Sequence, residues 1–205
     1  MSVRALLFDL DGVLVESFEA WFCVVSEAGR LFRGRPITRA EFTPIFGQTT
    51  AADIAAFGLA CSPEELDRFY AAALSRHADR VRVDPEAARL LAELRALGLK
   101  LAVVTNTVSA AAVAILETAG LYGYFDHVAC ADHVARGKPA PDLPLAALAA
   151  LSVEARGAWL VGDTRYDREA AQAALVRFVG LRIDGQARIE RLSELSGLVL
   201  DEPEV

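Results

Sequence analysis

The sequence of 205 residues has no long apolar run, although 54% of its residues are hydrophobic. A helix that crosses a bilayer needs about 20 consecutive apolar residues, so we expect no membrane-spanning segment. The amino terminus is strand-like and runs into acidic residues, which argues against a secretory signal. Internal repeats and low-complexity linkers are also missing. The length therefore predicts one well-formed core with room for a small second module.

Cysteine is scarce, with three residues at widely spaced positions, Cys23, Cys61 and Cys130. An odd number at these spacings fits neither a disulfide framework nor a metal site. Reduced cysteines are typical of cytosolic proteins, so we expect a cytoplasmic protein with cysteine in its core.

Positive charge is also scarce, because 21 lysines and arginines face 28 acidic residues and give a net charge of −7. This balance argues against nucleic acid or an anionic membrane as the main partner. Only two lysines occur, Lys100 and Lys138. A lysine retained in an arginine-rich chain is a candidate for chemistry, with chance as the alternative.

The stretch around which the chain is organised lies near the amino terminus. The apolar residues 3–8 predict a buried strand, and Asp9, Asp11 and Gly12 follow it at once. Two carboxylates so close together repel unless a cation or a shared proton lies between them. Mg²⁺ is the obvious cation, because it binds one or two carboxylates together with phosphate oxygens.

Beyond residue 84 the pattern alternates between helix and strand. Expected strands cover 100–105, 127–130, 158–161 and 176–181, and expected helices cover 84–98, 109–119, 142–151, 165–174 and 189–195, with a possible edge strand at 198–200. Apolar spacing indicates that Leu90, Leu91, Leu94 and Leu97 point inward from the first of these helices. Such alternation predicts a parallel sheet with helices on both faces.

The segment between the first strand and this region predicts helices and loops, with no strand from Glu16 to Arg80. One helix would bury Phe18, Trp21 and Phe22, with Leu31 continuing the face. We therefore expect an α/β fold: a Rossmann-like three-layer α/β/α core with a mainly parallel sheet, formed by residues 1–15 and 82–205, and an inserted all-α cap formed by residues 16–81.

Polar residues follow four of the expected strands: Asp9 and Asp11, Thr105 and Asn106, Lys138, and Asp163. In open α/β sheets the carboxyl ends of the strands meet at one edge, where ligands bind. A set of carboxylates, one ammonium and hydrogen-bond donors suits the binding and transfer of phosphate better than it suits hydride transfer. A carboxylate can attack phosphorus, and the phosphoryl oxygens need positive charge and donors around them.

Four ordered motifs carry a resemblance to a known family. They are residues 8–14 (FDLDGVL), 103–106 (VVTN), 137–139 (GKP) and 161–167 (VGDTRYD). Together they resemble the haloacid dehalogenase superfamily, and the helical insertion resembles the cap of its phosphoglycolate phosphatase-like and β-phosphoglucomutase-like branch. The resemblance spans the whole core.

For the catalytic chemistry, the resemblance implies that Asp9 is the nucleophile that attacks phosphorus. Asp11 would be the general acid to the leaving oxygen and then the general base for water. Thr105 and the amide of Asn106 would hold phosphate oxygens, and Lys138 would neutralise the nucleophile and the transferring group.

For the metal, the resemblance implies that Mg²⁺ is bound by Asp9, by the backbone carbonyl of Asp11 and by Asp163. Asp167 would be a further ligand or a partner just outside the metal's contacts. The spacing of Asp163 and Asp167 is about one helical turn, which brings both carboxylates toward the same place if a helix begins near Thr164.

Within the superfamily, the aspartate at Asp11 indicates phosphate ester chemistry, because dehalogenases do not keep an acid there. No lysine lies between residues 16 and 81, so the Schiff-base route of phosphonate-hydrolysing relatives is absent. The mutase relatives usually carry a cap histidine where this chain has Trp21. We therefore favour a Mg²⁺-dependent phosphatase, with a sugar-phosphate mutase and a non-catalytic phosphometabolite-binding module as alternatives.

Substrate specificity is expected from the cap. Gly47 and Gln48 resemble a cap loop that leans over the active site, where Gln48 either binds substrate or faces water. Four arginines cluster in the cap, Arg30, Arg33, Arg35 and Arg39; either they form a solvated face or one binds a second anionic group. The expected partner is a small phosphorylated metabolite resembling phosphoglycolate or a sugar phosphate, bound by a monomer or homodimer.

Overall fold

The computed structural model describes residues 3–201, so the ends of the predicted core, residues 1–2 and 202–205, lie outside it. The predicted α/β fold is confirmed. Six parallel strands form one sheet in the order β5-β4-β1-β6-β7-β8. The strands are β1 (Ala5–Phe8), β4 (Lys100–Thr105), β5 (His127–Cys130), β6 (Ala158–Gly162), β7 (Arg177–Leu181) and β8 (Ala187–Ile189).

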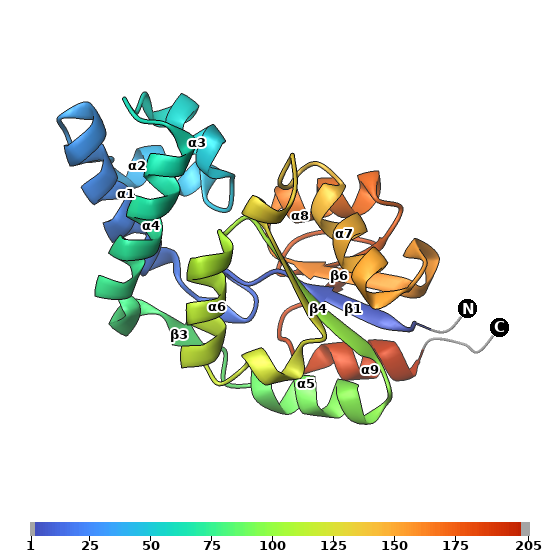
Figure 1. Cartoon of the computed structure of the whole chain (residues 1–205). Coiled ribbons are helices and arrows are strands. Elements are labelled where there is room, and N and C mark those ends of the chain that lie inside the picture. Colours follow the sequence, from blue (N-terminus) through green and yellow to red (C-terminus); the bar gives the residue numbers. More distant parts are fainter. Residues whose placement is uncertain (1–2, 202–205) are drawn as a thin grey trace.

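Helices cover both faces of the sheet (Figure 1). Leu6 and Phe8 of β1 pack into one apolar cluster with α5 (Ala87–Ala96), α6 (Ser109–Thr118) and α9 (Glu194–Leu200). Ala5 and Leu7 point the other way, into a cluster with α7 (Asp142–Leu151) and α8 (Arg165–Ala173). Because successive side chains of a strand point to opposite faces, an uninterrupted apolar strand is buried on both sides.

The strand register brings the candidate residues to one edge of the sheet. Phe8 of β1 lies opposite Val103 of β4 and Val161 of β6, so the three strands end at nearly the same level. Asp9 follows β1 directly, and Asp163 follows β6. The carboxyl edge of a sheet with this strand order is where α/β proteins bind ligands.

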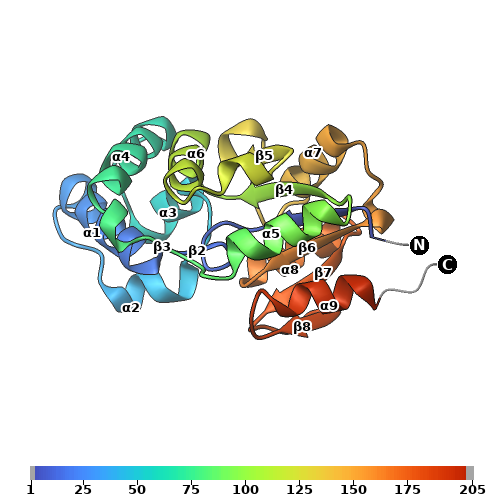
Figure 2. The same cartoon turned by 90° about the horizontal axis from the view of Figure 1, so that it is seen from below.

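Residues 18–80 form helices and loops and lie to one side of the sheet (Figures 1 and 2). They contain α1 (Phe18–Arg33), α2 (Arg39–Phe42), α3 (Thr50–Phe57) and α4 (Pro63–Arg76), with short 3₁₀ turns at 43–45 and 78–80. The local signals act as expected: Gly34 ends α1 in the left-handed region at φ 75°, and Ser62 and Glu65 form a capping box that begins α4.

Two expectations for this region are wrong in detail. Glu16 belongs to a two-residue strand, β2 (Val15–Glu16), which pairs antiparallel with β3 (Arg82–Val83) where the chain leaves and re-enters the sheet domain. Leu31 is 62% exposed, because the buried face of α1 continues through the neighbouring Phe32, whose ring lies edge-on to Phe69.

A third expectation fails at the end of α5. Leu97 is 49% exposed, whereas Leu90, Leu91 and Leu94 are buried as predicted. The helix ends at Ala96, and Gly98 follows in the left-handed conformation at φ 78°. Leu97 therefore lies just beyond the end of the helix, and its side chain does not join the buried face formed by Leu90, Leu91 and Leu94.

The carboxyl-terminal prediction is also corrected. Residues 187–189 form the edge strand β8, with Ile189 opposite Leu181, instead of beginning a helix at 189. Residues 198–200, expected as a possible edge strand, end helix α9, in which Leu195 is fully buried. Pairing with the neighbouring strand β7 decides the first element, and packing against α5, which is distant in sequence, decides the second.

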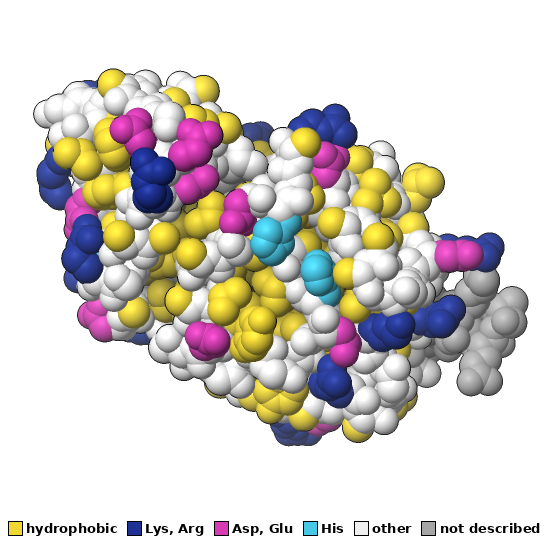
Figure 3. All heavy atoms as spheres, viewed as in Figure 1, with side chains coloured by type: hydrophobic (Ala, Val, Ile, Leu, Met, Phe, Trp, Pro, Cys, Tyr) yellow, Lys and Arg dark blue, Asp and Glu magenta, His cyan; other side chains and the backbone are white. Residues whose placement is uncertain are grey.

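The surface shows where the cap meets the core (Figure 3). Helices α4 and α6 contact each other, and a groove beside them is lined by apolar side chains that include Leu74, Val83 and Ile115. Across residues 3–201, none of the helices is both long enough and apolar enough to cross a membrane.

Candidate active site

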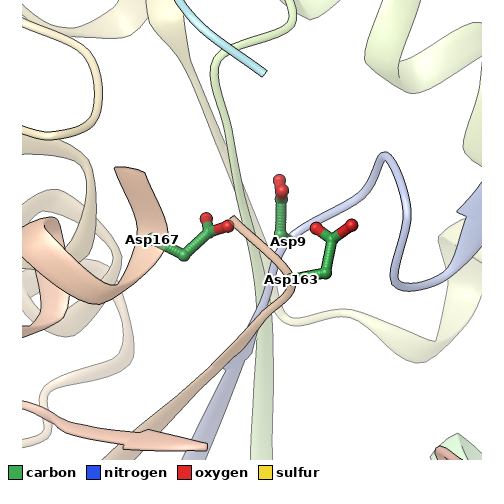
Figure 4. A group of neighbouring side chains, drawn as sticks. All are labelled: Asp9, Asp163 and Asp167. Carbon is green, nitrogen blue, oxygen red and sulfur yellow. The ribbon is translucent and has the colours of Figure 1, made fainter. Parts of the chain in front are cut away.

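Three carboxylates converge at the carboxyl edge of the sheet (Figure 4). One oxygen of each of Asp9, Asp163 and Asp167 lies within 4.8 Å of the others. Asp9 comes from the end of β1, Asp163 from the end of β6 and Asp167 from the first turn of α8. The group matches three of the four predicted metal residues, and carboxylates this close repel one another strongly unless positive charge compensates them.

Lys138 supplies positive charge from within the protein. Its Nζ lies 2.7 Å from Oδ1 of Asp9 and 2.6 Å from Oδ1 of Asp167, and it also donates to the carbonyl of Val104 at 3.0 Å. The side chain is 2% exposed. Burial alone would lower the pKa of this lysine, but the neighbouring Asp167 and Asp9 carboxylates raise it above its usual value, so the ammonium stays charged.

Asp9 is the most strongly perturbed acid of the group. Burial, followed by the nearby Asp167 carboxylate, raises its pKa well above the ordinary value, while the Lys138 ammonium opposes the rise. The N–H of Leu10 donates to its Oδ1 at 2.8 Å. A buried carboxylate beside an ammonium, at the open end of a strand, has the surroundings expected of a reactive group.

Asp163 is a candidate metal ligand. Burial and the Asp167 carboxylate raise its pKa to about 7, against the opposing effect of Lys138. Within residues 3–201, its Oδ1 atom is buried and has no hydrogen-bond partner. Gly12 leaves room for it: at φ 85°, a Cβ on Gly12 would lie 2.1 Å from Oδ2 of Asp163. Unsatisfied carboxylate oxygen beside Asp9 fits a hard divalent cation such as Mg²⁺.

Asp167 is already engaged through both oxygens. Oδ1 accepts from Lys138, and Oδ2 accepts from the backbone N–H of Thr164 at 3.0 Å and from its hydroxyl. Thr164 and Asp167 form the capping box that begins α8. Of its two predicted roles, ligand or partner beyond the metal's contacts, this geometry favours the second.

Asp11 lies apart from the three-carboxylate group and faces the cap. Its Oδ1 accepts from the hydroxyl of Ser17 and from Nε1 of Trp21 at 2.9 Å, and its Oδ2 accepts from Oγ1 of Thr107 at 2.8 Å. The side chain is therefore held by three donors. Metal binding through its backbone carbonyl stays a prediction.

The two predicted phosphate-binding residues follow β4. Thr105 is buried, and its Oγ1 accepts from the N–H of Thr107 at 3.0 Å. The side-chain amide of Asn106 donates to the carbonyls of Gly47 and Lys138, both at 2.9 Å, and accepts from the N–H of Lys138 at 2.8 Å. Asn106 therefore fixes the lysine loop and the cap loop, and its side-chain N–H groups already have acceptors.

A narrow cavity of about 50 Å³ lies over these residues. Asp9, Thr105 and Lys138 line it from the core, and Gly47 and Gln48 line it from the cap. The predicted cap loop therefore does lean over the site. Nε2 of Gln48 donates to Oδ1 of Asp53 at 2.8 Å, so one side of this half-buried amide is held by the cap.

The cap arginines do not reach the cavity. Arg33 forms a two-pronged ion pair with Glu41, with both N···O distances at 3.0 Å, and Arg39 pairs with Glu19 at 2.7 and 2.8 Å. The guanidinium of Arg39 also lies 4.5 Å from the ring centre of Phe22. The side chain of Arg33 is 9% exposed and that of Arg39 is 50% exposed, so only Arg39 lies on a solvated face, and the ion pairs of both disfavour the binding of a second anion.

Several residues that contact the site were not predicted as site residues. Ser17, Trp21 and Thr107 hold Asp11, and Asp53 and Tyr70 line the cavity from the cap. The sequence holds weak signals for two of them: Thr107 directly follows the motif at residues 103–106, and Trp21 lies one helical turn after Ser17. Nothing in the sequence pattern links Asp53 to Tyr70, because their contact joins two helices.

Comparison with known proteins gives a consistent picture. The model of the haloacid dehalogenase-like hydrolase family matches residues 6–181. A protein described as the probable phosphatase IndB of Dickeya dadantii is 35% identical over 193 residues, which cover 86% of this chain and 80% of that protein. The phosphoglycolate phosphatase of Rhodospirillum rubrum is 32% identical over 188 residues, which cover 86% and 78% of the two chains.

Solved structures show the same architecture. The crystal structure of CbbY from Rhodobacter sphaeroides in complex with phosphate superposes with a TM-score of 0.85 and 24% sequence identity. The match covers 98% of this chain and 100% of that one. At this level of identity the likeness concerns the fold, including the helical segment inserted after β1.

Proposed function

Because the chain belongs to the haloacid dehalogenase-like hydrolase family and is a phosphatase of small phosphorylated substrates, we propose that it hydrolyses a phosphate monoester through a phosphoryl group carried on Asp9. The observation that carries the proposal is the buried contact of 2.7 Å between Asp9 and Lys138 at the floor of the cavity. The ammonium neutralises a carboxylate that would otherwise repel a phosphate dianion.

In the first step, a carboxylate oxygen of Asp9 forms a bond to phosphorus as the bond to the ester oxygen breaks. Asp11 donates its proton to that leaving oxygen, so an alcohol departs. In the second step, Asp11 takes a proton from water, the water oxygen bonds to phosphorus, and the Asp9 carboxylate is released with inorganic phosphate. The hydroxyl of Thr105 donates to a phosphoryl oxygen, and the Lys138 ammonium lowers the negative charge that the phosphoryl group meets.

The surroundings of Asp11 suit a group that alternates between acid and base. The hydroxyls of Ser17 and Thr107 can donate to the carboxylate and can also accept a hydrogen bond from the protonated acid. Trp21 can only donate, and its Nε1 holds Oδ1 of the carboxylate in place. These three residues hold Asp11 in the same position when it is protonated and when it is deprotonated.

Asp9 and Asp163 are the residues we propose to hold Mg²⁺, with Asp167 supporting Lys138. A bound Mg²⁺ supplies positive charge for the phosphoryl oxygens and orients the phosphate. The unpartnered Oδ1 of Asp163 supports this assignment. Residues 1–15 and 82–205 then form the proposed catalytic core, and residues 16–81 form the proposed cap that selects the substrate.

The metal dependence tests the proposal. Release of phosphate from p-nitrophenyl phosphate is expected to stop after treatment with EDTA and to return with added Mg²⁺. Asp163→Asn is expected to raise the Mg²⁺ concentration needed for half-maximal activity roughly 10- to 100-fold, because it removes a charged ligand. Activity that survives complete metal removal would exclude the proposed metal role. Interconversion of hexose phosphates without phosphate release would instead support the mutase alternative.

Trp21 offers a second test. Trp21→Phe is expected to lower kcat for p-nitrophenyl phosphate about 10-fold with little change in KM, because it loosens Asp11 without touching the phosphate site. Trp159→Phe, a change of the other tryptophan at a buried position in β6 away from the cavity, is the control. Equal kinetics for the two variants would show that the Trp21 hydrogen bond has no catalytic role.

A further inference from the structure

The cap side of the cavity carries a buried hydrogen-bonded group that the proposed chemistry does not use. Asp53 of α3 accepts from Nε2 of Gln48 through Oδ1 and from the hydroxyl of Tyr70 through Oδ2, both at 2.8 Å. Asp53 is 7% exposed and Tyr70 is 4% exposed. All three side chains line the same cavity as Asp9 and Lys138. We refer to Gln48, Asp53 and Tyr70 as the cap triad.

The cap triad lies where the leaving group of a phosphate ester would be. The ring of Tyr70 lies edge-on to Trp21, with 5.5 Å between ring centres, and Trp21 donates to Asp11. A continuous set of contacts therefore runs from the proposed general acid to Asp53. Because Asp11 protonates the leaving oxygen, the part of the substrate beyond that oxygen faces this wall of the cavity.

The charge of the cavity excludes a second anion. Among the described residues that line it, Lys138 is the single cation, and its ammonium is already shared by Asp9 and Asp167. The cap arginines with ion pairs to Glu19 and Glu41 lie outside it. A carboxylate on the leaving group would meet the Asp53 carboxylate without a compensating charge, which is strongly unfavourable in a buried site.

The cap triad instead offers acceptors. Each carboxylate oxygen of Asp53 can accept a second hydrogen bond, since Gln48 and Tyr70 use one position on each. The carbonyl oxygen of Gln48 and the hydroxyl oxygen of Tyr70 are acceptors as well. The rings of Trp21, Phe46 and Tyr70 supply apolar surface for carbon atoms between polar groups.

We propose that the leaving group of the substrate is an uncharged polyhydroxy group, a small polyol or sugar, whose hydroxyls donate to Asp53, and that phosphate esters bearing a carboxylate are poor substrates. This inference rests on the proposed phosphatase activity. Of the two expected kinds of substrate, one resembling phosphoglycolate and one resembling a sugar phosphate, it selects the second. It separates this chain from relatives such as the R. rubrum phosphoglycolate phosphatase, whose named substrate carries a carboxylate.

Matched pairs of esters test the inference with the wild-type protein. In glycerol 3-phosphate and 3-phosphoglycerate, a CH₂OH group in one replaces the carboxylate of the other; sorbitol 6-phosphate and 6-phosphogluconate form the same pair with six carbons. The expected kcat/KM in Mg²⁺ is at least about 10-fold higher for the alcohol in at least one pair, and not lower in the other. Equal or faster hydrolysis of the carboxylate esters overturns the inference.

Asp53→Asn ties the selectivity to the cap triad. The amide keeps the shape and one acceptor but removes the charge, so the alcohol-to-carboxylate ratio is expected to fall about 10-fold. Glu64→Gln, the same chemical change at an exposed position of α4, is expected to leave the ratio unchanged. A wild-type ratio in a folded Asp53→Asn protein overturns the role of Asp53.

Failure of the inference can be told from failure of the proposed function. Wild-type protein that does not release phosphate from p-nitrophenyl phosphate in Mg²⁺ contradicts both. Wild-type protein that hydrolyses p-nitrophenyl phosphate but shows no preference within either pair contradicts the substrate class alone. The wild-type ratios require no variant to fold, so they decide the question by themselves.

Discussion

Asp9→Asn is expected to lower kcat for phosphate release at least about 10⁴-fold, because an amide cannot attack phosphorus to form the acyl phosphate. The same variant should fold, since the amide oxygen still accepts from the N–H of Leu10. Steady-state release of phosphate from p-nitrophenyl phosphate measures the loss. A parallel assay for acid-stable, hydroxylamine-sensitive phosphate on the protein should detect it with the wild type and not with the variant.

We also expect Asp9→Asn to affect the stability of the folded protein. Burial raises the pKa of Asp9, so the folded protein binds this proton more tightly than the unfolded chain does. The contribution of Asp9 to stability therefore falls as the pH rises above the unfolded value of about 3.9, and the neutral amide avoids this loss. We expect the variant to be at least as stable as the wild type at pH 7.

An exposed aspartate provides the control for Asp9. The side chain of Asp184 is 86% exposed, pairs with Arg188 and does not line the cavity. Asp184→Asn is expected to keep wild-type activity and stability. Residual activity of a few per cent in Asp9→Asn, with no contaminating phosphatase in a mock preparation, would exclude Asp9 as the nucleophile.

Lys138→Met is expected to have the second-largest effect, lowering kcat/KM about 10³-fold and the free energy of unfolding by about 3–5 kcal/mol at pH 7. The ammonium lies between the buried carboxylates of Asp9 and Asp167, and its removal leaves both without their buried cation. The apolar side chain fills similar space, so loss of charge dominates over loss of packing. Urea unfolding in the absence of added metal measures the destabilisation.

The pH dependence of this variant identifies the cause. Lys138 lowers the pKa of Asp9, so its removal raises that pKa further and lets the acid become neutral at a higher pH. The deficit in stability relative to the wild type should therefore shrink as the pH falls from 7 toward 5. Lys100→Met is the control, because Lys100 is exposed and contacts the backbone of Leu151 on the sheet's other edge. A deficit that is constant with pH would point to packing instead of charge.

Several features could be predicted from the sequence because they depend on neighbours in the chain. The apolar run that ends at Phe8 specifies a doubly buried strand, and the acids that follow it must then lie at the strand end. Ser62 and Glu65 begin α4 through bonds to each other's backbone, so their identity and spacing suffice. Lys138 stood out through its rarity, and the motif around it located its loop.

Other features were decided by the tertiary structure. The donors to Asp11 lie 6, 10 and 96 residues away in the chain, and only the packing of α1 and the β4 loop against β1 brings them to one carboxylate. β8 is a strand because β7 offers it a partner, which local apolar spacing does not reveal. The register of the sheet likewise decides that Asp163 meets Asp9.

Asp9 and Asp11 show this division most clearly. Their position after the first strand, and the need for a compensating cation, follow from the sequence, because like charges close together repel wherever the chain folds. Which acid faces Lys138 and which faces the cap does not follow, since it depends on side-chain directions set by distant strands and helices. The sequence alone determined the fold and the family chemistry. Only the tertiary structure placed Asp53 beside the cavity and kept Arg33 and Arg39 out of it. The reason is that hydrogen bonds and ion pairs between separate helices set the positions of these side chains.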